Sequence, residues 1–326
     1  METSKRSDGE QKTIAIVGGG ISGIVAAKVF RQGGYDVTVF EKSNKYGGIW
    51  SRGYHSLGLQ TNRDFFELPD FAFPEHYPKN PGWEMIYDYF ESYVEHFKLN
   101  PVIKLETEVT ETKHNPETDT FSVTTLSHHE VKEVRFDYLI IASGIWAYPV
   151  VPKFTGAKDT TIPIIHSSEF QKHHIENSEK PLVIGFGKSA LDIAEAIARQ
   201  HDTKVNLLYR TPNWLYDRVS AENGVTKEKY GRLFPPHHTA SKETLEEYAK
   251  NGETAKAEEK EQFLEDLKKK MKLEEYNLVP KTKPFYSSLN VAVNPTFLSV
   301  LEEGKIRLIE DEIETVNGDS ITLKNS

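Results

Sequence analysis

Two glycine-rich segments, each following a short apolar run and opening a helix-like run, constrain the fold of this chain more than any other feature. Their glycines, with an alanine in the last place of the second segment, are Gly18, Gly20 and Gly23, and then Gly185, Gly187 and Ala190. The first glycine of such a turn permits a tight strand-to-helix connection, the second lets the backbone approach a pyrophosphate, and the third lets the helix lie close to the sheet. The helix N-terminus then attracts the phosphates. The two segments predict an α/β fold with two Rossmann-like dinucleotide-binding domains.

The residues around each segment complete a β–α–β pattern of about 30 residues, which is the length expected of one such unit. The expected elements are the strand Thr13–Val17, the helix Ile21–Gln32 and the strand Asp36–Phe40, and then the strand in PLVIGFG from Pro181, the helix Ser189–Arg199 and the strand Val205–Tyr209. A chance glycine-rich turn would lack this order of elements, so the pattern favours true dinucleotide sites.

The second strand of each unit ends in a residue of opposite charge. Glu41 lies 18 residues past Gly23 and is expected to accept hydrogen bonds from a ribose. Arg210 ends the corresponding strand of the second unit, where a guanidinium can pair with the 2′-phosphate of NADPH; the alternative is an ordinary surface arginine. Lys188 and Ser189 are further candidates for phosphate contacts. The sequence thus predicts a two-dinucleotide-binding flavoprotein fold, with FAD in the first site and NADPH delivering hydride from the second.

The remaining pattern suggests the limits of the domains. We expect a disordered tail over residues 1–12, an FAD-binding domain over 13–157 and an NADPH-binding domain over 158–326, with a helical insertion at about 215–280. Within the insertion the charged stretch Glu253–Tyr276 is predicted to be a solvated helix rather than a binding arm. Further expected elements are the helix Trp83–Phe97, the strands Val109–Thr112, Phe121–Leu126 and Glu133–Ile141, and a closing hairpin of Lys305–Val316 and Ser320–Leu323.

Composition narrows the class of function. The chain has 326 residues, 37% of them hydrophobic and 27% charged, which is typical of a globular protein. Its net charge of −9 argues against nucleic acid as a partner. The absence of cysteine excludes disulfides, thiolate metal sites and a redox-active cysteine pair, and therefore the disulfide reductases that share a two-site plan. Residues 1–12 do not resemble a secretory signal and no apolar run of 18 residues occurs, so we expect a cytoplasmic protein without a membrane span.

Several longer segments make the sequence more specific. They are EKSNKYGGIW with Gly47, Gly48 and Trp50, LQTNRDFFELPDFAFP with Thr61 and Asn62, ASGIWAYPVVPKFTG from Ala142, HSSEF from His166, VIGFGKSALDIA from Val183 and LLYRTPNW from Leu207. Together they resemble the flavin-containing monooxygenase family over nearly the whole chain outside 215–280.

The resemblance implies a chemistry. NADPH reduces FAD, dioxygen adds to form a C4a-hydroperoxyflavin, and a soft nitrogen or sulfur nucleophile of a small molecule takes up oxygen; such a reaction needs a dry, shaped pocket more than acid or base groups. Asn62 matches the family's catalytic asparagine beside the flavin, although an asparagine before Arg63 could also simply form a turn. Trp50 could equally be a core residue. The remaining cofactor contacts that the resemblance implies are Ser22, Lys42, Gly48, Ile49, Trp50, Thr61, Val109, Ala142, Ser143 and Gly144.

Two departures from the family pattern leave alternatives open. In the identifying motif FxGxxxHxxx(Y/F)(K/R), His166 and Phe170 are kept, while Thr160, Ile162 and Gln171 occupy the other defined places. Baeyer–Villiger relatives place tryptophan where this chain has Phe170, so the resemblance favours heteroatom oxygenation over Baeyer–Villiger oxidation of ketones.

The second departure is at the end of the sequence. The sequence ends before the segment that completes the flavin sheet in the family, so a truncated dinucleotide-binding protein without oxygenase turnover is the third alternative. The sequence leaves open whether the chain forms a homo-oligomer.

Overall fold

The computed structural model describes residues 11–60, 63–146, 148–176, 179–200, 204–217, 257–282, 290–294 and 296–325. The chain divides into two compact units, each with its own parallel sheet. The first unit comprises residues 1–53, 67–77 and 81–149, and the second comprises 54–66, 78–80 and 150–326. The segment after residue 53 therefore belongs to the second unit before the chain returns to the first.

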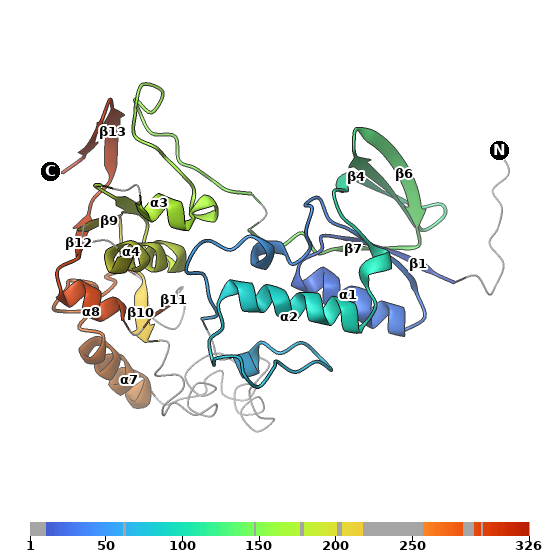
Figure 1. Ribbon diagram of the computed structural model, residues 1–326, viewed down its shortest axis with the longest axis horizontal. Coiled ribbons are helices and arrows are strands. Elements are labelled where there is room, and N and C mark those ends of the chain that lie inside the picture. The colour runs from blue at the N-terminus through green and yellow to red at the C-terminus, as the bar shows by residue number, and fades with distance from the viewer. Residues whose placement is uncertain are drawn as a thin grey trace. The chain divides into compact units, whose positions relative to one another are not determined.

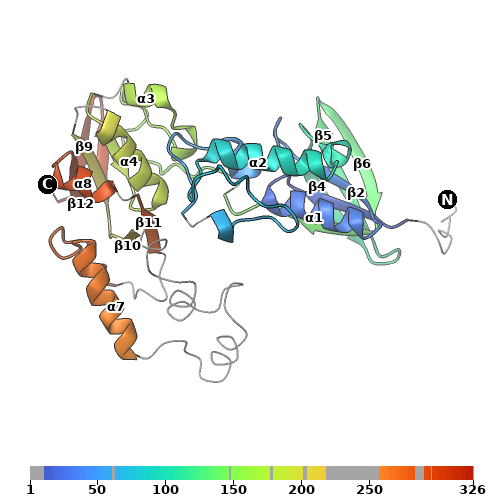
Figure 2. The same cartoon turned by 60° about the horizontal axis from the view of Figure 1, so that its bottom comes forward.

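The first unit contains a four-stranded parallel sheet in the order β3-β2-β1-β7. Strands β1 and β7 are labelled in Figure 1. Its strands are β1 (Thr13–Val17), β2 (Asp36–Phe40), β3 (Ile103–Lys104) and β7 (Tyr138–Ile141). The central residues of β1 are fully buried, as expected of a strand covered on both faces. Helix α1 (Ile21–Gln32) connects β1 to β2, helix α2 (Trp83–His96) precedes β3, and the two helices run side by side in both views (Figures 1 and 2). The predicted first β–α–β unit is confirmed to the residue.

An antiparallel sheet forms a second layer of this unit. It consists of β4 (Glu108–Asn115), β5 (Thr120–Ser127) and β6 (Glu130–Phe136) in sequential order. Val123 and Phe136 of this sheet share a core cluster with Ala15 and Phe40 of the parallel sheet, and the rings of Phe40 and Phe136 meet edge to face at 5.9 Å between centroids. The core thus ties the two sheets together.

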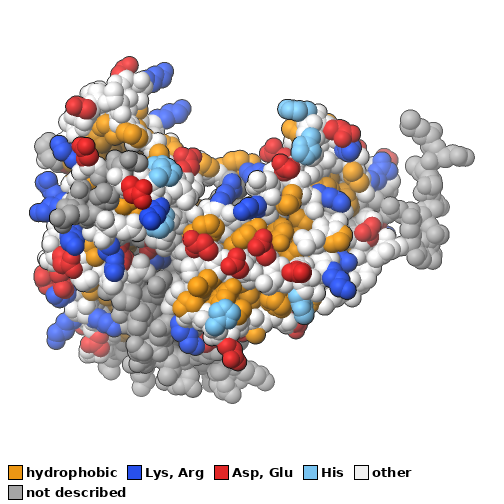
Figure 3. Space-filling model, in the orientation of Figure 1, with side chains coloured by type: hydrophobic (Ala, Val, Ile, Leu, Met, Phe, Trp, Pro, Cys, Tyr) orange, Lys and Arg blue, Asp and Glu red, His pale blue; other side chains and the backbone are white. Residues whose placement is uncertain are grey.

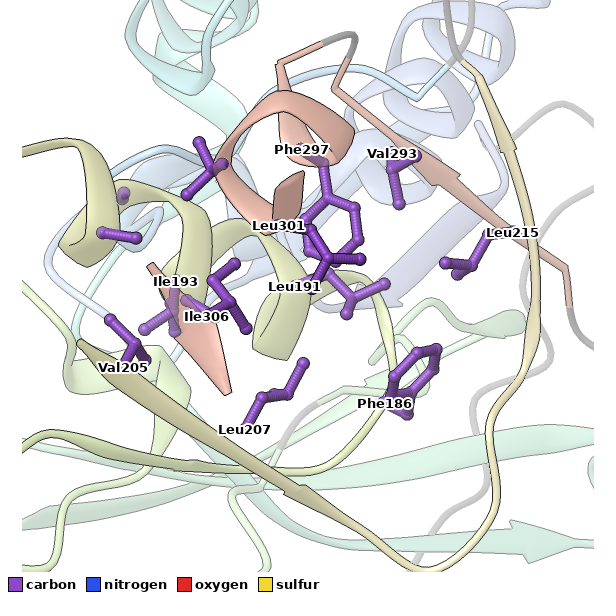
Figure 4. Packing of buried hydrophobic residues seen from close by; sticks show 14 of the residues in the cluster. Phe186, Leu191, Ile193, Val205, Leu207, Leu215, Val293, Phe297, Leu301 and Ile306 are labelled. Carbon is purple, nitrogen blue, oxygen red and sulfur yellow. The ribbon is translucent and has the colours of Figure 1, made fainter. Parts of the chain in front are cut away.

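The second unit repeats the β–α–β plan. Its parallel sheet has the order β12-β9-β8, formed by β8 (Leu182–Ile184), β9 (Val205–Tyr209) and β12 (Ile306–Glu310). The additional elements are α3 (Lys172–Glu176), α4 (Lys188–Gln200), α7 (Ala257–Lys270), α8 (Phe297–Glu302), the parallel pair β10 (Trp214–Asp217) and β11 (Asn290–Val293), and the hairpin β13 (Ile313–Asn317) and β14 (Ser320–Leu323). Leu191, Phe297 and Leu301 point toward one another in the centre of its core (Figure 4). Short 3₁₀ turns occur at Gly48–Ser51, Arg63–Phe65, Asn100–Val102 and Ser167–Glu169.

Two expected strands were wrong in extent. The predicted strand Glu133–Ile141 is split at Asp137, because the Asp137 carboxylate accepts hydrogen bonds from the Thr13 N–H and hydroxyl, both at 2.8 Å. The chain thereby leaves the antiparallel sheet and enters the parallel one. The predicted strand Lys305–Val316 is split in the same way at Asp311, whose carboxylate accepts from the Glu312 N–H at 2.7 Å.

The charged stretch Glu253–Tyr276 was expected to be a solvated helix throughout, and this is only partly correct. Residues 253–256 lie outside the described part of the chain, α7 ends at Lys270, and turns follow it. Leu267, Met271 and Leu273 are buried in the core of the second unit, so this region is anchored rather than free. No helix among the described residues is long and apolar enough to cross a membrane. Acidic and basic side chains are interspersed over the face shown in Figure 3.

Candidate functional site

The carboxyl edge of the first sheet gathers residues from three strands. The register pairs Val17 of β1 with the last residues of β2 and β7. The residues that follow, Gly18, Glu41 and Ala142, therefore meet at one edge, where ligands bind in sheets of this kind. The Gly18 N–H donates to the Phe40 carbonyl at 2.8 Å, which holds the turn against its neighbouring strand.

The three glycines of the first turn are required for different reasons. Gly18 has a φ of +106°, and a Cβ there would lie 2.4 Å from the Ala142 carbonyl oxygen. A Cβ at Gly23 would lie 1.9 Å from the Gly18 carbonyl oxygen, so only glycine lets α1 approach the turn. A Cβ at Gly20 would meet only the Gly48 Cα, at 3.8 Å. Packing therefore explains Gly18 and Gly23, whereas Gly20 leaves open space over the backbone, as close approach of a phosphate requires.

Glu41 is buried and holds the turn as well as facing the site. One carboxylate oxygen accepts from the Gly19 N–H at 2.8 Å, and the other accepts from the Ser43 N–H at 2.8 Å. A carboxylate offers about four acceptor positions, so two remain for ribose hydroxyls. Gly20, the N-cap residue of α1, provides no side-chain cap, and the first turn of the helix carries no acidic residue, so its positive end is not neutralised there.

The GGIW segment lies against this turn. The Gly47 N–H donates to the Gly19 carbonyl at 2.8 Å, and a Cβ at Gly48 would lie 3.2 Å from the Gly20 Cα. Trp50 is buried while Ile49 is exposed. The structure thus brings the GGIW segment onto the first glycine turn.

The other residues predicted for the first site lie on α1, on β4 and on the segments that follow β2 and β7. Ser22 is exposed in the first turn of α1, and the Lys42 ammonium lies 4.0 Å from the centroid of the Tyr148 ring. Val109 lies in β4, two residues past Thr107, whose N–H donates to the Glu41 carbonyl at 2.9 Å. Ser143 and Gly144 follow Ala142 in exposed positions, and Thr61 and Asn62 lie outside the described residues.

The second turn has the same geometry. Gly185 has a φ of +118°, and its N–H donates to the Leu208 carbonyl of β9 at 2.8 Å. A Cβ at Gly187 would meet no atom within 4 Å, which again leaves the backbone open to a ligand. The Ala190 Cβ lies 3.6 Å from the position of a Cβ on Gly185, an ordinary contact, so alanine suffices in the third place. Both turns therefore fit a dinucleotide pyrophosphate.

The side chains of Lys188 and Ser189 have partners inside the protein. The Lys188 ammonium pairs with the Asp192 carboxylate at 2.5 Å, and the Tyr54 hydroxyl donates to the other oxygen of Asp192 at 2.8 Å. Tyr54 also forms a hydrogen bond with Ser189. Burial raises the pKa of Asp192, and Lys188 and Tyr54 oppose that change. Arg210, by contrast, is exposed at the end of β9. The hydrogen bond and charge of Lys324 lower the pKa of Glu312, and the Arg210 charge adds to this effect.

Sequence reasoning missed Tyr54 and Asp192. The spacing of four residues between Lys188 and Asp192 places them on one helix face and could have revealed the pair. Tyr54 is 138 residues from Asp192, and nothing local in the sequence indicates that contact. His166 accepts a hydrogen bond from the Ser168 N–H at 3.2 Å, and Phe170 is buried.

A model described as flavin-binding monooxygenase-like matches residues 11–317. The human flavin-containing monooxygenase 3 is 28% identical over 223 residues, which are 64% of this chain and 42% of that protein. The human dimethylaniline monooxygenase (N-oxide-forming) 4 is 30% identical over 224 residues, which are 64% of this chain and 40% of that protein. The matched region thus spans less than half the length of either relative.

A solved structure supports the fold. The structure of OTEMO in complex with FAD and NADP superposes with a TM-score of 0.74 at 18% identity, and the match covers 97% of this chain and 69% of that one. The predicted fold class, α/β with two Rossmann-like dinucleotide-binding domains, is confirmed.

Proposed function

The chain belongs to the flavin-binding monooxygenase-like family, and from that premise we propose that it is an FAD- and NADPH-dependent monooxygenase that oxygenates a soft nitrogen or sulfur nucleophile of a small molecule. The observation that carries this proposal is the pair of glycine turns followed by residues of opposite charge. Glu41 suits the ribose of FAD at the first turn, and Arg210 suits the 2′-phosphate of NADPH at the second.

The residues of the chain bind and orient the cofactors rather than react with the substrate. The backbone around Gly20 would hold the FAD pyrophosphate while Glu41 orients the adenosine ribose, and the backbone around Gly187 would hold the pyrophosphate of NADPH. The Gly47–Gly48 segment lies where it would close over the FAD phosphates. Bound reduced FAD supplies the activation of dioxygen and NADPH supplies the hydride.

The remaining contacts stay predictions on the strength of the motifs. Asn62 would hold polar groups of the reacting flavin, with Thr61 beside it. The choice of a nitrogen or sulfur substrate rests on the phenylalanine at position 170 and on the sequence relatives, one of which is named for N-oxide formation.

The test is product analysis with isotopically labelled dioxygen. The FAD-loaded chain is incubated with NADPH and labelled dioxygen in three separate reactions. Their substrates are dimethylaniline, a dialkyl thioether and a cyclic ketone. We expect a labelled N-oxide or sulfoxide formed one for one with NADPH consumed. A labelled lactone from the ketone alone would replace this substrate class with Baeyer–Villiger oxidation. Flavin binding without any labelled product would favour the dinucleotide-binding alternative.

A further inference from the structure

At the start of α4, next to the second glycine turn, a positive charge is paired with a buried carboxylate. Lys188 is the first residue of α4, yet only 12% of its side chain is exposed and its ammonium lies 2.5 Å from the Asp192 carboxylate, which is 2% exposed. The Tyr54 hydroxyl holds the second Asp192 oxygen, and the Ser56 hydroxyl donates to the Asp192 backbone carbonyl at 3.4 Å. Asp192 therefore has partners on both oxygens and a fixed position.

The electrostatics of this arrangement differ from those of a free lysine at a phosphate site. An ammonium this close to a carboxylate presents little net charge to an anion bound at the helix end. Glu195, one helical turn further along α4, is also buried and adds negative charge near Asp192. A flexible lysine side chain freed from this pair could reach an anion at the same helix end.

We propose that Asp192 is a positioning residue that withholds Lys188 from the dinucleotide pyrophosphate, so that the Arg210 contact to the 2′-phosphate dominates recognition. The proposal rests on the proposed NADPH site. The pyrophosphate is common to NADH and NADPH, so a strong lysine contact there would tighten both equally. Restraining that contact lowers the affinity for both equally, so the 2′-phosphate contact of Arg210 makes up a larger share of NADPH binding. This also revises the role predicted for Lys188.

The test measures dissociation constants by calorimetry on the FAD-loaded full chain. The probes are ADP-ribose, which has the pyrophosphate but no 2′-phosphate, and 2′-phospho-ADP-ribose, which has both. We expect Asp192→Asn to bind both probes about three- to tenfold more tightly, with the ratio of the two constants unchanged. The double variant Lys188→Met/Asp192→Asn should return to within about twofold of the wild type, because the gain requires the freed ammonium.

Two further variants serve as controls. Tyr54→Phe removes a hydrogen bond to Asp192 but leaves both charges, so both dissociation constants should stay within about twofold of the wild type. Arg210→Ala should instead weaken only 2′-phospho-ADP-ribose and bring the two constants together. If Asp192→Asn does not fold, Asp192→Ser, which also removes the carboxylate charge, replaces it.

The outcomes separate this inference from the proposed function. Weaker or unchanged binding in Asp192→Asn would overturn it and leave Asp192 a structural residue. A double variant that binds both probes about tenfold less tightly than the wild type would also overturn it, since Lys188 would then contact phosphate directly. Arg210→Ala with an unchanged ratio would overturn the NADPH assignment and with it the dominance of Arg210, while the restraint of Lys188 by Asp192 would still be tested by Asp192→Asn. Absence of probe binding in both the wild type and Asp192→Asn would overturn both.

Discussion

Glu41 is the single residue on which the first site depends most. Each of its carboxylate oxygens accepts a backbone N–H, from Gly19 and from Ser43. In Glu41→Gln the charged acceptor is lost, and an amide NH₂ would face ribose hydroxyls that donate to the carboxylate, which costs about 2 kcal/mol of binding free energy. We expect FAD to bind roughly thirtyfold more weakly, measured by fluorescence quenching during titration.

The matched control for Glu41→Gln is Glu130→Gln. Glu130 is an exposed residue of β6 that pairs with Lys132 on the surface. This change should leave FAD affinity within about twofold of the wild type, because exposed ion pairs contribute little. Equal FAD affinity in Glu41→Gln and the wild type would show that Glu41 does not shape the site.

Asp137 gives the first unit a specific pH dependence. Although burial opposes its ionisation, the Thr13 N–H and hydroxyl and the Lys12 ammonium lower the pKa of Asp137 from 3.8 to about 2. The folded-state pKa is depressed, so the stabilisation is present above pH 3.8 and is lost as the pH falls toward 2. It amounts to about 2 kcal/mol near neutral pH.

Urea unfolding of the wild type and Asp137→Asn at pH 6 and pH 3 measures this contribution. The variant should be less stable by about 1–2 kcal/mol at pH 6 and by less at pH 3. A difference that is the same at both pH values, or larger at pH 3, would contradict the assignment.

At the scale of elements, the β1–α1 turn separates residues needed for folding from residues needed for binding. Gly20→Ala places a Cβ in contact only with the Gly48 Cα at 3.8 Å, whereas Gly23→Ala places one 1.9 Å from the Gly18 carbonyl oxygen. We expect Gly20→Ala to keep its stability without FAD but to bind FAD at least about tenfold more weakly. Gly23→Ala should lose about 1–3 kcal/mol of stability.

Thermal unfolding without FAD and FAD titration of both variants check this separation. Equal loss of stability in the two variants would mean that Gly20 is a packing residue, and the open space above it would then have no bearing on phosphate binding.

The elements themselves show which features the sequence could predict. The strands and helices of both β–α–β units follow from local apolar periodicity and glycine spacing, and their limits agree closely with the structure. The break at Asp137 could not be predicted in this way, because its partner Thr13 lies 124 residues away. The parallel pairing of β10 with β11 also could not be predicted from local sequence, because the two strands are far apart in the chain.

The site was predictable to a similar degree. Gly18, Glu41 and Ala142 each follow a strand that the sequence pattern predicts, and the register shows that they meet at one edge of the parallel sheet. The pairing of Lys188 with Asp192 could have been expected from their spacing of four residues, whereas the Tyr54 contact to Asp192 could not, because Tyr54 comes from a distant segment.

At the scale of the whole molecule, the two units repeat one plan with a different charge at the end of the second strand. Each has a glycine turn at the carboxyl edge of a parallel sheet, and only the first follows it with a buried carboxylate. On this difference we propose FAD for the first unit and NADPH for the second, and electron transfer between the two cofactors is the central claim of the proposal.

Anaerobic reduction of the FAD-loaded chain tests that claim most directly. The chain should bind about one FAD per molecule, and NADPH should bleach the flavin absorbance in the blue at least about tenfold faster than NADH at equal concentration, because only NADPH offers a 2′-phosphate to Arg210. Failure to bind FAD, or bound FAD that neither nucleotide reduces, would contradict the account.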